Sequence, residues 1–219
     1  AQFVLAPAKN IHRVPEGLSL RDASFAEPVA IGVQACRRGD VQSGEYVLIL
    51  GCGPIGLALI EVVKARGAHV VATDVQPARL ETAALLGAQT LLSDEKLLTR
   101  VLEQTGGEGA PVVIEATGVP QVMEQTVDLV AAGGRIVIVG LVKKGVGVTF
   151  PGLDFTRKEM TVLGSRASVN CFPESLQLLA SGAITYPRLA TEISMWDAPQ
   201  IFRELNGNPA KLHKGVLVP

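Results

Sequence analysis

The sequence has few cysteines, and none is placed as structural or metal-binding cysteines usually are. Cys36, Cys52 and Cys171 are odd in number, lie far apart and form no CxxC pair in the 219 residues. This spacing excludes a disulfide framework and a zinc ribbon. It favours a reducing compartment, and we therefore expect a cytoplasmic protein.

The sequence also lacks an excess of charge of one sign and a long apolar run. Basic side chains number 20 and acidic ones 21, so no net field attracts nucleic acid or an anionic membrane. The longest uncharged apolar stretch, Tyr46 to Ile60, is broken by glycines and a proline. It is also shorter than the ~18 apolar residues of a membrane span. We predict neither a nucleic-acid partner nor a membrane partner.

The first residues lack the marks of a natural start. There is no initiator methionine and no signal peptide, and residues 1–15 have the composition of the middle of a strand. We interpret the chain as a fragment of a longer protein, with enough apolar material, 47% of its residues, to bury a core.

Short apolar runs alternate with segments of helical length along most of the chain. Two of the predicted helices end at Gly67 and Gly87, where a left-handed cap belongs. Strands separated by helices of about 10–15 residues imply a parallel sheet. We predict an α/β fold with a doubly wound, parallel, six-stranded Rossmann sheet. Its strands are expected at 46–50, 69–73, 90–92, 111–116, 135–140 and 161–165, and its helices at 54–66, 77–86, 94–104 and 120–130.

The predicted elements outside this sheet are fewer. Helical patterns cover 172–181 and 197–205, and 215–218 has the pattern of a strand without an obvious partner. Ser93 and Asp94 are expected to cap the helix that begins at residue 94.

A GxGxxG pattern lies between the first predicted strand and the helix that follows it. The first glycine permits a tight turn, the second lets the backbone approach a pyrophosphate, and the third lets the helix pack on the sheet. The N–H groups at the helix start then face the anion. We predict a dinucleotide-binding loop, with an ordinary strand–turn–helix as the alternative. The loop comprises Gly51, Cys52, Gly53, Pro54, Ile55 and Gly56.

An acidic residue follows at the end of the second predicted strand. Asp74 comes 18 residues after Gly56 and 23 after Gly51, which brackets the expected ~20. Its carboxylate should accept hydrogen bonds from the adenosine ribose hydroxyls and repel a 2′-phosphate. We therefore predict NAD rather than NADP as the cofactor, and Asp74 can also form a turn before Pro77.

Cys52 could carry a reactive thiolate at the helix start, although a small filler residue is the favoured interpretation.

Several runs of the sequence resemble the zinc-type medium-chain dehydrogenase/reductase family. They are AEPVAIGVQACRRG, VQSGEYVLILGCGPIGL, ATDVQPARLETAALLGA, VIEATGVPQVMEQTVDLVAAGGRIVIVGL and LDFTRKEMTVLGSRAS. Within the family, the nearest branches are the polyol (sorbitol dehydrogenase-like) enzymes and the sugar-acid 5-dehydrogenases of the L-idonate or L-galactonate type.

The resemblance implies a division of the chain into three parts. Residues 1–38 would be the C-terminal part of a GroES-like catalytic domain with a connecting helix. Residues 39–166 would form the NAD-binding Rossmann domain, and residues 167–219 would return to the catalytic domain. The metal-binding N-terminal half of the catalytic domain would then be missing.

Further cofactor contacts are implied by the same resemblance. Arg79 matches a basic residue at the adenosine ribose, and Lys214 matches one that reaches the pyrophosphate; either could instead be a solvated surface residue. Thr117 and Gly118 match the turn beneath the cofactor. The segment whose backbone holds the nicotinamide carboxamide matches Val139, Gly140 and Leu141.

Two residues are implied to act on the substrate. Glu27 resembles the glutamate that ligates the catalytic zinc or holds its water, whereas the sequence alone makes it a first-turn residue favoured by the helix dipole. Arg166 resembles an arginine that contacts polyol or sugar-acid groups, and a surface role is equally open. The other zinc ligands of the family lie in the missing half, so we expect zinc in the intact enzyme and not in this chain alone, where one carboxylate falls short of three protein ligands.

We therefore predict a zinc- and NAD-dependent dehydrogenase of a secondary alcohol, either a polyol or a sugar acid, of which this chain supplies the cofactor-binding part. The fragment alone is expected to be inactive. The alternatives are a non-catalytic NAD-binding module and a zinc-free quinone reductase-like member of the same superfamily. A homodimer or homotetramer is also expected, because residues 146–150 alternate as an edge strand would and relatives pair their sheets near this region.

Overall fold

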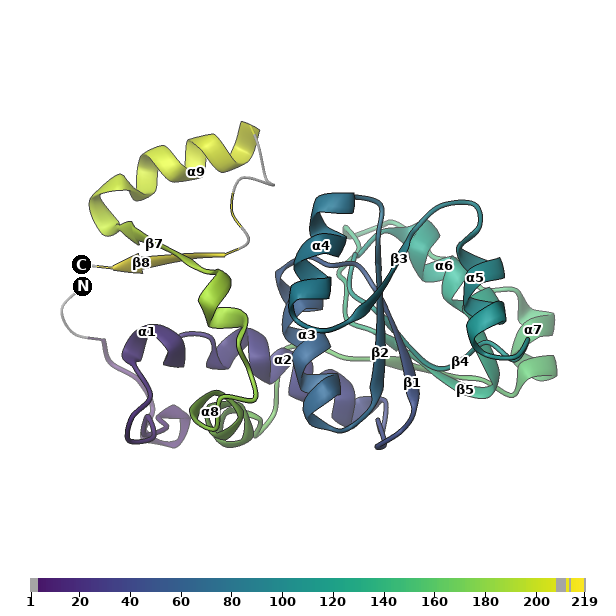
Figure 1. Cartoon of the computed structure of the whole chain (residues 1–219), viewed down its shortest axis with the longest axis horizontal. Helices are drawn as coiled ribbons and strands as arrows, with labels where there is room; N and C mark the ends of the chain where they lie inside the picture. The colour runs from purple at the N-terminus through teal and green to yellow at the C-terminus, as the bar shows by residue number, and fades with distance from the viewer. Residues whose placement is uncertain (1–3, 208–211, 213, 219) are drawn as a thin grey trace.

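The fold is described from a computed structural model of residues 4–207, 212 and 214–218, in which two lobes lie side by side (Figure 1). The larger lobe holds a six-stranded, wholly parallel sheet in the order β3-β2-β1-β4-β5-β6. This is the doubly wound Rossmann order, and it confirms the predicted fold class. The strands are β1 (Tyr46–Leu50), β2 (His69–Asp74), β3 (Gln89–Leu92), β4 (Ala110–Glu115), β5 (Val130–Ile138) and β6 (Thr161–Gly164).

Helices cover both faces of this sheet and form two separate cores. Successive residues of a strand point to opposite faces, so Val47 and Ile49 join one core whereas Leu48 and Leu50 join the other. The first core packs against α2, α3 and α4, and the second against α5 and α6. The helices are α2 (Ala26–Arg38), α3 (Pro54–Ala65), α4 (Pro77–Leu85), α5 (Leu97–Gln104), α6 (Pro120–Leu129) and, near the edge strand, α7 (Gly152–Lys158).

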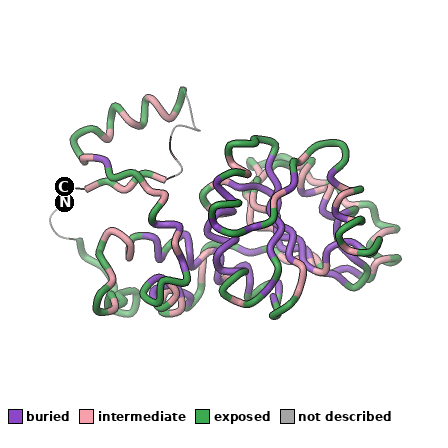
Figure 2. Tube along the Cα trace, in the orientation of Figure 1, coloured by how far each residue is buried: buried purple, intermediate pink, exposed green. Residues whose placement is uncertain are grey.

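The smaller lobe is built from both ends of the chain. Burial is dense in the sheet and on α2, whereas α9 contains no buried residue (Figure 2). The strand predicted at 215–218 does form, and its partner is a parallel strand formed by residues 191–194. The lobe consists of α1 (Leu20–Ala23), α8 (Phe172–Ala180), α9 (Ala198–Gly207), β7 (Thr191–Ser194), β8 (Gly215–Val218) and three 3₁₀ turns at Ala8–Asn10, Tyr186–Leu189 and Met195–Asp197.

A buried carboxylate connects the two lobes. Glu61 of α3 is only 3% exposed. Its oxygens accept hydrogen bonds from the N–H groups of Thr185 and Tyr186 and from the Thr185 hydroxyl, at 2.6–2.9 Å. A buried charge needs several such donors to offset its desolvation. Glu61 therefore fixes the chain that leads from α8 into the small sheet.

Four local predictions are corrected by the structure. The helix predicted from residue 94 begins at Leu97, because residues 94–96 form a turn in which the Asp94 carboxylate accepts the Lys96 N–H at 2.9 Å. β5 begins at Val130, directly where α6 ends, and stops at Ile138 rather than at residue 140. Residues 146–150 form no strand, and within 4–15 the structure shows one 3₁₀ turn and no strand.

None of the helices in the described residues is long and apolar enough to cross a membrane. The predicted domain boundaries at 38/39 and 166/167 stay predictions.

Candidate functional site

The glycine loop leaves β1 at the carboxyl edge of the sheet and turns directly into α3. Gly51 has a φ of +102°, which glycine adopts without strain. A Cβ on Gly56 would lie 1.9 Å from the carbonyl oxygen of Gly51, so the first turn of α3 touches the strand end. A Cβ on Gly53 would meet nothing within 4 Å. The loop is therefore tight on its inner side and open on its outer side, as backbone that receives a pyrophosphate must be.

Asp74 ends β2 beside this loop and is nearly buried, with 6% of its surface exposed. One carboxylate oxygen accepts the Cys52 N–H at 2.9 Å, and the other accepts the Gln76 N–H at 2.9 Å. The guanidinium of Arg79 lies 3.5 Å from the first oxygen. Asp74 thus forms the predicted turn before Pro77, and it also holds the glycine loop against this turn, which the sequence did not predict.

A cavity of about 460 Å³ opens between the glycine loop and the ends of the neighbouring strands. We call it the glycine-loop cavity. It lies where the strand order reverses between β1 and β4, which is where open α/β sheets bind their ligands. Its lining residues are Leu50, Gly51, Gly53, Pro54, Thr73, Asp74, Val75, Arg79, Ser93, Ala116, Thr117, Val119 and Val122.

A second cavity of about 410 Å³ continues along the same edge of the sheet. We call it the Arg166 cavity. Residues after β4, β5 and β6 line it together with one side of α2, and it shares Ala116 and Thr117 with the glycine-loop cavity. The two cavities therefore form one crevice in two halves. The lining of the second half is Glu27, Ile31, Ile55, Ala116, Thr117, Val139, Gly140, Leu141, Ser165, Arg166 and Ala167.

The polar groups of the Arg166 cavity come from distant parts of the chain. Glu27 lies in the first turn of α2, and Arg166 follows β6. Both side chains are exposed, and neither makes a hydrogen bond or ion pair with another residue of the described structure. The Ser165 hydroxyl is buried in the wall without a hydrogen-bond partner. A carboxylate and a guanidinium are thus left to meet a polar ligand, and a buried hydroxyl lies in the wall near them.

Glu27 does not make a metal site by itself. Among the described residues, no group of three or more His, Cys, Asp or Glu side chains could hold a metal ion. A structural or catalytic zinc takes three or four protein ligands. A zinc bound at Glu27 would therefore need ligands from beyond the described part of the chain.

Most predicted cofactor residues meet in the crevice, and three do not line it. Gly56 lies behind the glycine loop and packs on Gly51. Gly118 packs against the backbone of Leu141. Lys214 stands just before β8 in the small lobe, where its carbonyl accepts the Thr191 N–H at 2.9 Å. It lines neither cavity, and its contact with a pyrophosphate stays a prediction.

A reactive thiolate at Cys52 is excluded by the structure. The side chain is 2% exposed, and burial, with a smaller contribution from the Asp74 carboxylate, raises the pKa of the thiol to about 12. Its Sγ lies 3.5 Å from the Thr73 carbonyl oxygen. Cys52 is a small buried filler residue.

Sequence reasoning missed two functional candidates. Ser165 carries no signal beyond its place after a strand. Glu115 could have been noticed as an acid at the end of an apolar strand, yet it is fully buried.

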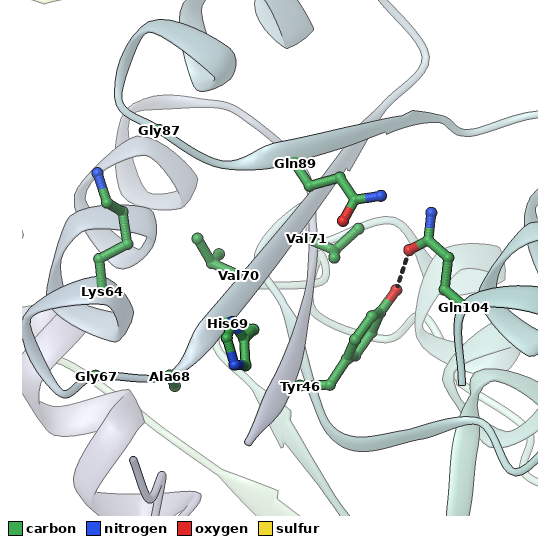
Figure 3. Close-up of a pocket in the computed structure, with 10 residues that line it drawn as sticks. All are labelled: Tyr46, Lys64, Gly67, Ala68, His69, Val70, Val71, Gly87, Gln89 and Gln104. Atoms are coloured by element: carbon green, nitrogen blue, oxygen red, sulfur yellow. Dashed lines mark hydrogen bonds between the residues drawn. The ribbon is translucent and has the colours of Figure 1, made fainter. Parts of the chain in front are cut away.

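A third hollow of about 680 Å³ lies at the opposite edge, where β1, β2 and β3 begin (Figure 3). Lys64 stands on one side of it and Tyr46 on the other, where the Tyr46 hydroxyl donates to Gln104 Oε1 at 2.9 Å. Lys64 Nζ donates to the carbonyl oxygen of Leu86. This edge holds the carboxyl ends of α3, α4 and α5 and no glycine loop.

The topology and the crevice define a dinucleotide-binding domain. The family of zinc-binding dehydrogenases matches residues 54–181, and the chain belongs to this family. An L-galactonate-5-dehydrogenase of Escherichia coli K12 is 38% identical over 194 residues, which are 87% of this chain and 56% of that protein. A sorbitol dehydrogenase of Bacillus subtilis is 29% identical over 195 residues, 87% of this chain and 55% of that protein.

A solved structure shows the same fold with a cofactor. It is a crystal structure of an alcohol dehydrogenase from Escherichia coli CFT073 in complex with NADH, with a TM-score of 0.86 and 25% identity. The match covers 97% of this chain and 63% of that one. The chain therefore spans a little over half the length of the proteins it resembles.

Proposed function

We propose that the chain is the NAD-binding part of a zinc-type dehydrogenase that oxidises a secondary alcohol of a polyol or a sugar acid. The observation that carries this proposal is the two-part crevice. One half has the glycine loop and Asp74, and the adjoining half has Glu27 and Arg166. Relatives named for L-galactonate and for sorbitol support the substrate class.

The cofactor is proposed to lie along the crevice. In the glycine-loop cavity, the N-terminal N–H groups of α3 bind the pyrophosphate. Asp74 accepts hydrogen bonds from the adenosine ribose, and Arg79 packs at its side. A 2′-phosphate would lose those hydrogen bonds, which are worth ~1.5–3 kcal/mol each when the acceptor is charged. We therefore propose NAD over NADP, by about 10–150-fold in affinity.

The nicotinamide half is proposed to occupy the Arg166 cavity. The backbone of Val139, Gly140 and Leu141 would hold the carboxamide over the turn at Thr117. Bound there, NAD supplies a ring carbon that accepts hydride. The walls of the cavity limit the access of water to that carbon, because Ile31 and Ile55 line it with apolar surface.

The substrate is proposed to enter from the open side of the Arg166 cavity. A guanidinium forms paired hydrogen bonds with a carboxylate or with neighbouring hydroxyls, and Arg166 has no other partner in the described structure. Glu27 lies on the same cavity and would hold a polar or metal-bound group of the intact enzyme. The described residues do not themselves form a zinc site.

Three measurements test this proposal. The chain should bind NADH in a fluorescence titration, and absence of binding would refute its cofactor role. The intact protein should oxidise members of a polyol and sugar-acid panel with NAD, and Arg166→Gln should raise KM for sugar acids more than for neutral polyols. An equal rise for both classes would remove Arg166 from carboxylate recognition. Zinc content and rate that are unchanged in Glu27→Ala would remove Glu27 from the site.

The non-catalytic NAD-binding module remains the second candidate, since the described residues complete a cofactor crevice without a metal site. An intact protein that binds NAD and converts no alcohol of the panel would favour it. A zinc-free quinone reductase is disfavoured by Glu27 and Arg166, and quinone reduction without zinc would restore it.

A homodimer or homotetramer is proposed as well. β6 is an edge strand of the sheet, although the strand expected at 146–150 is absent. A monomer mass that does not change with concentration in sedimentation would contradict this proposal. A cytoplasmic location stays a prediction from the cysteine pattern.

A further inference from the structure

Two loops cross in direct contact beneath the wall that the two cavities share. One is the turn at Thr117 and Gly118 after β4, and the other contains Gly140 and Leu141 after β5. A Cβ on Gly140 would lie 2.2 Å from the Gly118 nitrogen, and a Cβ on Gly118 would lie 2.8 Å from the Leu141 carbonyl oxygen. Neither glycine can be enlarged unless the loops separate.

Glu115, the last residue of β4, binds both loops from below. Its Oε1 accepts the N–H groups of Thr117 at 2.6 Å and Gly118 at 3.0 Å, and also the Thr117 hydroxyl. Its main-chain carbonyl accepts the N–H groups of Val139 at 2.9 Å and Gly140 at 3.1 Å. One residue thus organises both segments that meet at the crossing.

The second carboxylate oxygen of Glu115 has no partner although the residue is 0% exposed. A Cβ on Gly140 would lie 2.5 Å from this oxygen. Buried polar atoms are seldom left unpaired, because each costs its full desolvation. The carboxylate bears this cost while it holds the turn at Thr117 and Gly118, and the second loop is held by the Glu115 main-chain carbonyl.

We propose that Glu115 is a positioning residue for the nicotinamide half of the crevice. The inference rests on the proposed NAD site: with the adenosine and pyrophosphate in the glycine-loop cavity, the other half of the dinucleotide lies in the Arg166 cavity. Thr117, Gly140 and Leu141 line that cavity. The Glu115 carboxylate fixes the backbone N–H of Thr117 and its main-chain carbonyl fixes that of Gly140, although Glu115 itself does not line the cavity. The adenosine half depends on Asp74 and the glycine loop instead.

Glu61 is the matched control. It is also a buried glutamate that accepts two N–H groups and a hydroxyl, but both of its oxygens are paired. It lies on α3, faces residues 185–186 and lines neither cavity. Its replacement changes stability without acting on the crossing loops.

The test compares NAD with ADP-ribose, which lacks only the nicotinamide, as ligands of the full chain in isothermal titration. Glu115→Gln keeps the size of the side chain and removes its charge. We expect its NAD dissociation constant to rise by about tenfold, the effect of weakening charge-assisted hydrogen bonds, while that for ADP-ribose stays within about twofold. Glu61→Gln should leave the ratio of the two constants as in the wild type.

Glu115→Asp is the second variant, to be used if Glu115→Gln does not fold. Its shorter carboxylate keeps the charge and can still accept the N–H two residues on, so it should show the same selective loss to a smaller degree. Equal changes for both ligands, no change, or the same selective loss in Glu61→Gln would overturn the proposal. A wild-type chain that binds neither ligand would refute the NAD site itself, and with it the role of Glu115.

Discussion

The two edges of the parallel sheet differ in what they offer a ligand. The amino edge has a hollow of about 680 Å³, and the carboxyl edge has a crevice whose two halves measure about 460 and 410 Å³. Yet the amino edge presents the carboxyl ends of three helices, whose carbonyl groups repel a phosphate. The carboxyl edge presents the start of α3 and an open glycine. Backbone polarity therefore separates the two edges and supports the carboxyl edge as the proposed nucleotide site.

The largest predicted effect comes from Gly56→Ala. Its methyl group would lie 1.9 Å from the Gly51 carbonyl oxygen, a backbone atom that cannot move alone. We expect a loss of about 3 kcal/mol or more of unfolding free energy, measured by urea denaturation. Gly53→Ala is the control, because its methyl group enters open space: stability should stay near wild type while NAD binding weakens by about tenfold. If the two variants were equally stable, the glycine loop would not be close-packed at Gly56 and open at Gly53.

Asp74→Asn tests cofactor choice at the carboxyl edge. The amide still has an oxygen for one of the two backbone N–H groups that Asp74 accepts, but it is a weaker acceptor and carries no charge. We expect NAD affinity to fall by about tenfold, as for the loss of one charge-assisted hydrogen bond, while NADP affinity falls less. Titrations with both cofactors measure the ratio; an unchanged ratio would mean that Asp74 serves the loop alone.

Lys64→Met tests the opposite edge. The substitution keeps the aliphatic stem and removes the hydrogen bond to the Leu86 carbonyl oxygen at the end of α4. Stability should fall by about 1 kcal/mol or less, and NAD affinity should not change. A clear loss of NAD affinity in a fluorescence titration would indicate that the cofactor binds at the amino edge. It would refute the proposed difference between the two edges of the sheet.

The smallest effect at neutral pH is that of Cys52, whose pH dependence begins only above about pH 9. Burial raises its pKa from 9.0 to about 12, so the folded state keeps a proton that the unfolded state releases between these values. Stability from this thiol is complete below pH 9 and is lost as pH rises toward 12. Cys36 acts in the same direction. Cys52→Ala should make the decline of unfolding free energy above pH 9 shallower; an unchanged slope would show that Cys52 ionises freely.

The sequence predicted the carboxyl edge better than the rest of the molecule. The glycine spacing and Asp74 are local signals, because each residue type meets a backbone demand within its own β–α unit. Glu115 has only the weak local signal of an acid at the end of an apolar strand, and the bonds of its main-chain carbonyl to residues 139–140 lie beyond its own turn. Ser165 has no local signal beyond its place after a strand. The partner of β8 was missed for the same reason, since β7 is a four-residue strand about 20 residues away. Lys214 was carried over from a resemblance, and the described structure does not place it in the crevice.

The most direct test is a titration of the ¹⁵N-labelled chain with NAD, followed by amide NMR shifts. We expect large shifts for Gly51, Gly53, Asp74, Thr117 and Gly140 along the carboxyl edge. We expect none for the amino-edge residues His69, Gln89 and Gln104. Shifts concentrated at the amino edge, or shifts at neither edge, would contradict the assignment of the cofactor site.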